Sequence, residues 1–201
     1  MKNFIITSLL FILSFISYGQ HLETIKYGNI LEFRIPDKYE LRTNAYINEV
    51  KNEVLKGLDF KSSVSQYVLQ PKGMNDTNGK SDLYSRILIK VENGNFESNQ
   101  KLIKHSKSEL VELESYIKSE ISKISYIQLI KTTPVSILIL KSKGFIDFSY
   151  ISKDDEGNIV TRILTFSDIN YRIRISISFR ESEKYYWENS INDFLNSIKI
   201  K

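Results

Sequence analysis

The chain has 201 residues, of which 41% are hydrophobic, and its 28 lysines and arginines nearly balance its 24 aspartates and glutamates. This composition suits one folded domain with a sizeable core, and it lacks the concentrated basic footprint of a nucleic-acid-binding protein. The chain has no cysteine, which excludes disulfides, thiol nucleophiles, cysteine-based zinc sites and a lipid-anchored lipoprotein.

The first nineteen residues have the pattern of a secretory signal peptide. Lys2 precedes an apolar run over residues 4–16, and the small residues Ser17 and Gly19 follow it. The run is shorter than the about 20 residues that a membrane-spanning helix needs. We therefore expect cleavage after Gly19 rather than an uncleaved anchor. Residues 20–201 would then be a single exported domain, periplasmic or secreted, with no membrane span.

The first half of the expected domain mixes strands and helices. Alternating apolar residues and turn residues predict strands over residues 28–35, 64–69 and 84–91, the first ended by Pro36. Apolar spacings of three and four predict helices over residues 44–56 and 99–123. The second helix has the clearest stripe, which comprises Ile103, Leu110, Leu113, Ile117, Ile121 and Ile124.

The second half is rich in strands and ends in a helix. The same patterns predict strands over residues 126–131, 135–141, 145–152, 159–166 and 171–179, and a helix over 182–197. Hairpins are expected at residues 154–158 and at Asp168-Ile169; a two-residue loop at the second would place Phe166 opposite Tyr171. Antiparallel strands segregated from helices indicate an α+β layered sandwich.

Three stretches together resemble the PsbP-like family of small secreted α/β/α sandwiches, which includes the DcrB-type periplasmic proteins. They are residues 33–39 (Phe-Arg-Ile-Pro-Asp-Lys-Tyr), the strands over residues 145–179, and the closing segment from Tyr186-Trp187 to Ile200. The resemblance implies a PsbP-like fold and a non-catalytic role in docking to a larger assembly. Tyr39 stands where many members have Trp, and the lipobox cysteine of many bacterial members is missing. No functional residue is carried over.

The sequence contains few residue patterns that are typical of catalytic or metal-binding sites. His21 and His105 are the two histidines; His21 could bind copper only if cleavage fell beside it, and His105 reads as a surface or edge residue. Residues 154–158 and 75–79 are acidic or amide-rich turns that fail the spacing of an EF-hand loop. No phosphate-binding glycine motif, nucleophile elbow or zinc-protease motif occurs. We expect no catalytic residue, metal ligand or cofactor.

Two features favour a binding surface instead. Arg172 and Arg174 alternate with isoleucines on the last long strand, with Arg180 expected beside them, and guanidinium groups on one sheet face suit a carboxylate or phosphate. A solvated, ion-paired face is the competing interpretation. Tyr185 is a second candidate contact, because aromatic residues anchor interfaces, while Trp187 fits the core stripe of its helix.

The sequence thus favours an exported, non-catalytic domain that binds a protein or envelope component. Two alternatives stay open: a small secreted hydrolase that uses carboxylates, and an inhibitor or immunity-type protein. The hydrolase hypothesis requires a cleft with converging acids. The inhibitor hypothesis predicts a binding interface, as does the favoured hypothesis of a binding domain.

Overall fold

The computed structural model describes residues 23–42, 67–77, 81–98, 107–122 and 128–201. The expected signal peptide, the helix over residues 44–56 and both histidines lie outside these ranges. In chain order the elements are β1 (Thr24–Tyr27), β2 (Leu31–Arg34), β3 (Tyr39–Leu41), β4 (Tyr67–Pro71), β5 (Ser85–Asn93), α4 (Lys107–Ser122), β6 (Gln128–Thr132), β7 (Ser136–Leu140), β8 (Lys143–Asp154), β9 (Gly157–Ser167), β10 (Tyr171–Arg180), the 3₁₀-helix η1 (Glu181–Glu183), α5 (Lys184–Ser197) and β11 (Lys199–Ile200).

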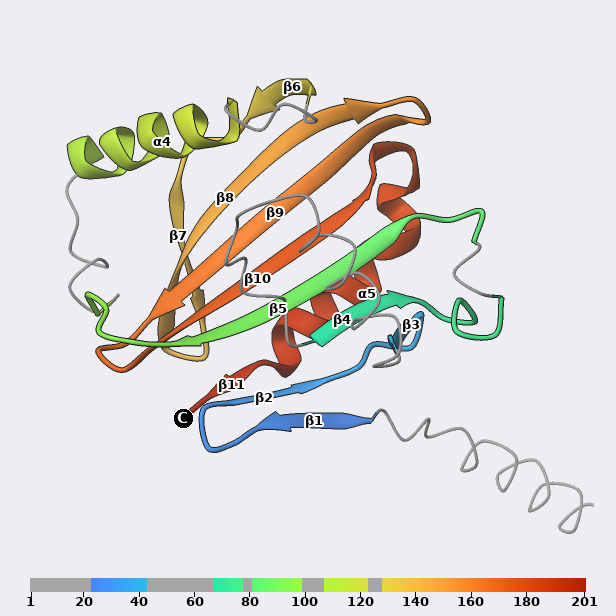
Figure 1. The fold of residues 1–201 in the computed structure, drawn as a ribbon, viewed down its shortest axis with the longest axis horizontal. Helices are drawn as coiled ribbons and strands as arrows, with labels where there is room; N and C mark the ends of the chain where they lie inside the picture. Colours follow the sequence, from blue (N-terminus) through green and yellow to red (C-terminus); the bar gives the residue numbers. More distant parts are fainter. Residues whose placement is uncertain (1–22, 43–66, 78–80, 99–106, 123–127) are drawn as a thin grey trace, which may run out of the picture.

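The main sheet has eight strands in the order β3-β4-β5-β10-β9-β8-β6, with β7 also paired to β8 (Figure 1). All of its pairings are antiparallel. The prediction of an α+β fold with a mainly antiparallel sheet is confirmed. The predicted strands of the second half match β6 to β10 to within a few residues at each end.

The register predicted for the β9–β10 hairpin is wrong by two residues. Phe166 lies opposite Ile173, and Leu164 lies opposite Ile175. The loop still has two residues but lies one position later, at Ile169-Asn170, because the Asp168 N–H donates to the Tyr171 carbonyl at 2.8 Å and so pairs these two residues. A two-residue shift keeps every apolar side chain on the same face of the sheet, so the alternation alone cannot distinguish the two registers.

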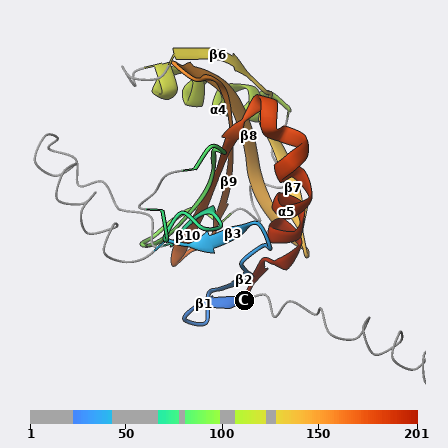
Figure 2. The same ribbon diagram turned by 90° about the vertical axis from the view of Figure 1, so that its right-hand side faces the viewer.

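One face of the main sheet packs against α5 and β2. The fully buried Ile173, Ile175 and Ile177 of β10 lie in one core cluster with Trp187 and Phe194 of α5. The apolar stripe predicted for this helix is confirmed, and Trp187 is only 1% exposed. Figure 2 shows α5 on one side of the curved sheet and α4 on the other.

The opposite face carries α4 at one end. Leu110, Leu113, Ile117 and Ile121 pack with Val135, Phe148 and neighbouring residues of β6 and β8 in a second cluster. The stripe predicted from the sequence is confirmed for these four residues, while Ile103 and Ile124 lie outside the described ranges. The sheet therefore stands between two helices, as a layered sandwich requires.

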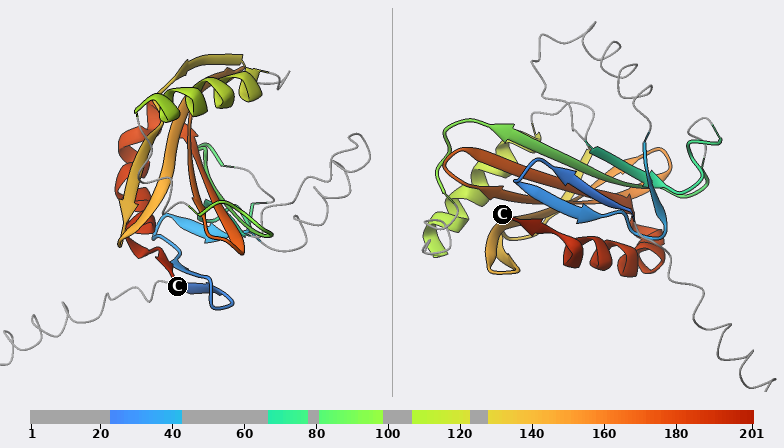
Figure 3. Two further views of the ribbon diagram at one scale, coloured as in Figure 1. Left: turned by 90° about the vertical axis from the view of Figure 1, so that its left-hand side faces the viewer. Right: turned by 90° about the horizontal axis from the view of Figure 1, so that it is seen from below.

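A small sheet of order β1-β2-β11 lies beside the main one (Figure 3). The strand expected over residues 28–35 is shorter, because Gly28 adopts a φ of +50° and the Ile30 N–H donates to the Tyr27 carbonyl. That turn folds β1 back onto β2. The sequence analysis missed β1: Ile25 and Tyr27 alternate with Thr24 and Lys26, but the run has only four residues and none of them is fully buried.

The loop after β4 is organised around one carboxylate. Glu40 accepts hydrogen bonds from the Gly73 N–H at 2.9 Å, the Asn75 N–H at 2.6 Å and the Gln70 side-chain amide at 3.0 Å. Burial alone would raise the pKa of Glu40, but these donors lower it below its usual value. The loop over residues 71–77, which overlaps the turn expected over residues 75–79, thus forms a cradle for a side chain of the chain itself.

Candidate functional site

The arginine pair, Arg172 and Arg174, lies on the face of β10 opposite α5. Both alternate with isoleucines that are fully buried against the helix, so their own side chains project from the other face. Arg172 lies between Glu92 of β5 and Ser167 of β9. Arg174 lies between Lys90 and Thr165. The expectation that both guanidiniums share one sheet face is confirmed.

Arg172 is held in place by an aromatic ring. Its guanidinium carbon lies 4.3 Å from the centroid of the Phe96 ring, and its Nε donates to Ser167 Oγ at 3.3 Å. Phe96 is itself anchored, since its N–H donates to the Ile169 carbonyl at 3.0 Å. Stacking on one side of a planar guanidinium leaves its terminal nitrogens available for an anion.

Gly94 makes room for that ring. A Cβ atom built at Gly94 would lie 3.0 Å from Cζ of Phe96, closer than most side chains approach, so the ring would have to shift by a few tenths of an ångström. The sequence reading did not select Phe96, Ser167 or Gly94. Their role appears only when the loop after β5 and the β9–β10 loop are brought together.

Glu92 supplies the counter-charge beside the arginine pair. It forms an ion pair with Lys90. Burial alone would raise the pKa of Glu92, but the hydrogen bond and charge of Lys90, with smaller effects of Arg174 and Arg172, lower it. Three cations therefore surround one ionised carboxylate. Arg174 is exposed, and no hydrogen bond or ion pair within the described ranges holds its guanidinium. The cluster keeps an excess of positive charge.

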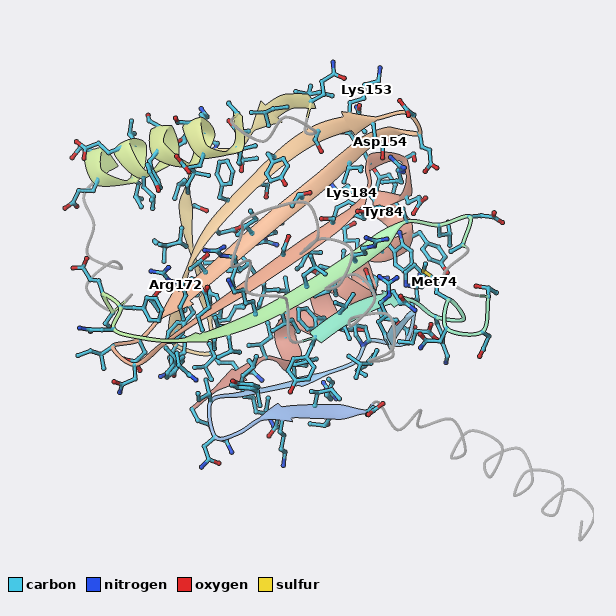
Figure 4. All side chains as sticks on the ribbon, in the orientation of Figure 1. Met74, Tyr84, Lys153, Asp154, Arg172 and Lys184 are labelled. Atoms are coloured by element: carbon cyan, nitrogen blue, oxygen red, sulfur yellow. The ribbon has the colours of Figure 1, made fainter. Side chains whose placement is uncertain are left out.

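Arg180 does not join the pair, contrary to expectation. It is 7% exposed and forms ion pairs with Asp154 and Glu156 of the β8–β9 hairpin. The hydrogen bond that Arg180 donates to Asp154 raises the pKa of Arg180. Eight residues of extended strand separate it from Arg172, roughly 27 Å. Figure 4 shows Arg172 near one end of the sheet and Asp154 and Tyr84 near the other.

The β8–β9 hairpin is accordingly a structural element rather than a calcium loop. Asp154 and Glu156, its two acids nearest Arg180, are neutralised by that side chain. Within the ranges that the structure describes, no group of three or more histidines and acids is arranged to hold a metal ion. The hairpin turns over two residues, because Asp154 pairs with Gly157.

Tyr185 lies on α5, on the other side of the sheet. It is 88% exposed, whereas Trp187 in the same turn is buried against Tyr39, with ring centroids 5.1 Å apart. Tyr186 is covered in part by Lys38, whose Nζ lies 3.7 Å from the ring centroid. The candidate residues from the sequence thus form two separate surfaces, the arginine pair and the outer face of α5.

Comparison with known proteins supports the fold and leaves the site open. No family model matches the sequence, and no curated protein matches it. Among solved structures, the chain is similar to cyanobacterial PsbP (CyanoP) from Synechocystis sp. PCC 6803, with a TM-score of 0.54 and 7% identity, over 92% of this chain and 96% of that one. The fold is therefore PsbP-like.

Two further structures match more loosely. LpqN, involved in cell envelope biogenesis of Mycobacterium tuberculosis, gives a TM-score of 0.48 at 9% identity, over 92% of this chain and 87% of that one. A protein from Bacteroides thetaiotaomicron VPI-5482 gives 0.43 at 9% identity, and the match covers 88% of this chain but 47% of that one.

Proposed function

We propose that residues 20–201 form an exported, non-catalytic domain that binds a protein or envelope component through an anionic group held by the arginine pair. The observation that carries this proposal is the state of Arg174: an exposed guanidinium without a hydrogen-bond partner among the described residues, beside one that Phe96 orients. A carboxylate or phosphate group matches the fork geometry of guanidinium donors.

The carboxylates with a shifted pKa are not candidates for a general acid. Glu32, Glu40, Glu92, Glu114 and Asp154 all have a pKa below the usual value, because hydrogen bonds and nearby cations stabilise the charged form more than burial opposes it. A general acid of a glycoside hydrolase needs a raised pKa instead. This supports the binding proposal for these five acids only.

Export rests on the amino-terminal segment. Its charged start, apolar centre and small residues fit a secretory signal. The PsbP-like fold agrees with the family resemblance of the sequence, whose members are secreted or periplasmic. In the portion of the chain that the structure describes, no helix has the length and apolar character to cross a membrane.

The test is capture of a partner by the tagged mature protein from its native envelope fraction. We expect Arg174→Gln to weaken capture at least about tenfold, the loss of one charge-assisted hydrogen-bond pair. Lys153→Gln is the matched control, because it removes a positive charge that is also exposed, on β8 and remote from the pair. Tyr185→Ala tests the outer face of α5 separately.

The outcomes separate the readings. Capture that survives Arg174→Gln but fails with Tyr185→Ala would refute the anion site and place docking on α5. Equal losses with Arg174→Gln and Lys153→Gln would indicate non-specific charge attraction. A captured enzyme that loses activity in the complex would identify an inhibitor or immunity-type protein. Turnover of a glycoside or ester substrate by the purified domain would overturn the non-catalytic proposal.

A further inference from the structure

The outer edge of the main sheet beside β8 is shared by two short strands. β6 pairs with the carboxyl-terminal half of β8, and β7 pairs with its amino-terminal half (Figures 1 and 2). Among the described residues, each has β8 as its one strand partner. An edge strand presents unpaired backbone groups and invites another strand unless the protein protects it.

The β6 half of this edge is protected. Its register with β8 shifts between Leu129 and Lys131, and Lys131 adds a charge there. Pro134 follows and lacks an N–H donor. The next N–H, that of Val135, donates to Glu114 of α4. Each of these features discourages an added strand.

The β7 half has none of these features. Its sequence, Ser-Ile-Leu-Ile-Leu, contains no charge, and Ile139 is 54% exposed. Lys141 and Ser142 have φ values of 44° and 70°, as in the type I′ turn that joins two strands directly. Leu140 and Lys143 are therefore a hydrogen-bonded pair. Alternation along the strand then directs the N–H and C=O groups of Ile137 and Ile139 away from β8.

We infer that β7 pairs antiparallel with β7 of a second copy, centred on Leu138. In this register Ile137 of one copy faces Ile139 of the other, and the two residues exchange both backbone hydrogen bonds. Their side chains meet on the α4 face of the joined sheets, where β-branched residues form favourable cross-strand pairs. The two main sheets become one continuous sheet.

Length and charge both favour a second copy as the occupant. The accessible edge is limited by the Lys141-Ser142 turn at one end and by α4 at the other, so it fits a strand as short as β7 itself. α4 carries four glutamates and two lysines. The antiparallel arrangement brings the turn that carries Lys141, an exposed cation, to the Val135 and Glu114 end of the other copy. Glu114 already forms an ion pair with Lys118, but α4 has two more glutamates than lysines, so Lys141 meets a helix of net negative charge at both ends of the pair.

The arrangement also closes on itself. A two-fold interface uses the same surface on both copies, so no second β7 edge is left to extend the assembly. The far edge of the main sheet is β3, which has only three residues. A dimer rather than a fibre is the expected product.

Sedimentation velocity of the mature protein, over two orders of magnitude in concentration, tests the inference. We expect a monomer–dimer equilibrium for the parent. Ile139→Lys adds an edge charge, and Ile137→Pro removes an outward N–H without removing a bond to β8; each should raise the dimer dissociation constant at least about tenfold. Ile130→Lys is the control, because Ile130 is 51% exposed on β6. It should leave the equilibrium unchanged.

A disulfide assay tests the register and traps the dimer even where it is weak. Leu138 faces its own copy as a non-hydrogen-bonded pair, with Cα atoms about 4.5 Å apart, so Leu138→Cys should form an intermolecular disulfide on oxidation. Ile139→Cys places the two sulfur-bearing residues on a diagonal of roughly 7–8 Å, beyond easy bridging. The parent has no cysteine to interfere.

A parent that stays monomeric at every concentration, with no Leu138→Cys disulfide, overturns the inference. So does a dimer that Ile139→Lys and Ile137→Pro leave intact, or equal cross-linking of both cysteine variants. A monomer whose capture of an envelope protein is lost in Ile139→Lys would also overturn it and assign the edge to a different chain. None of these results depends on Arg174, so the proposed function is tested independently.

Discussion

Removing the Glu183 carboxylate should destabilise the protein by breaking two hydrogen bonds at the start of α5. Glu183 Oε2 accepts from the Trp187 indole N–H at 2.8 Å and from the Tyr84 backbone N–H at 3.0 Å. The indole is almost completely buried, so Glu183→Ala leaves a donor that water reaches poorly. Such an unsatisfied donor is costly, because burial has already removed its bonds to solvent.

The expected loss is about 3 kcal/mol of unfolding free energy, since a hydrogen bond to a charged group contributes about 1.5–3 kcal/mol and Tyr84 regains part of its bond from water. For a domain of this size the melting temperature should fall by roughly 6–12 °C. Denaturant titration followed by fluorescence measures the loss directly, because Trp187 is the single tryptophan of the chain.

Glu181→Ala is the matched control. Its carboxylate accepts from the exposed Asn158 amide at 2.9 Å, a bond that water replaces readily. It should cost at most about 0.5 kcal/mol. If Glu183→Ala costs no more than Glu181→Ala, the reasoning from buried donors is refuted.

The remaining predictions concern the core, the cradle, the hairpin and the site. Phe194→Ala removes a fully buried ring and should cost about 3–5 kcal/mol in denaturant titration. Glu40→Gln should lower the unfolding free energy by about 1 kcal/mol at neutral pH. The folded pKa of Glu40 lies below 4.5, so this difference from the parent should vanish as pH falls through that lower pKa. A difference that stays constant with pH would contradict the prediction. Gly157 has a φ of +128°, so Gly157→Ala should lower the unfolding free energy by about 1–3 kcal/mol, measured as a lower melting temperature. Gly94→Ala should weaken partner capture by displacing Phe96 from Arg172, while unfolding free energy changes by less than about 1 kcal/mol; equal capture would exclude a positioning role.

Regular alternation made the main sheet predictable. In β10, buried Tyr171 and three buried isoleucines alternate with more exposed polar residues as predicted, and the pattern breaks only at the end, where Phe179 is half-buried and Arg180 is buried. α4 was equally clear, because four apolar residues fall on one stripe. β1 was missed since it buries little and depends on pairing with β2. The alternation of Ile25 and Tyr27 extends over only four residues, the shortest run from which a strand can be predicted.

The candidate site was predictable in part. Arg172 and Arg174 share a face because strand alternation requires it. Which residues flank them depends on strand order: Glu92 and Lys90 lie some eighty residues earlier and become neighbours only because β5 pairs with β10. Arg180 follows the same alternation along β10 as Arg172 and Arg174, but the sequence did not predict its ion pairs with the β8–β9 hairpin. The alternation of residues along a strand predicts which face of the sheet a side chain occupies. Its distance along the strand and the strand pairing decide which other side chains lie near it.

The small sheet also sets the order in which the protein can fold. β11 pairs with β2, Arg34 N–H donates to Ser197 Oγ at 2.9 Å, and Lys199 Nζ reaches Glu32 Oε1 at 2.6 Å. All three links join segments more than 160 residues apart, so they cannot form until residues 197–200 have been synthesised. Contacts of such long range are slow to form, because the loop entropy is lost before they stabilise the chain. The sheet that β1 and β2 begin therefore stays incomplete until the last segment of the chain is available to add β11.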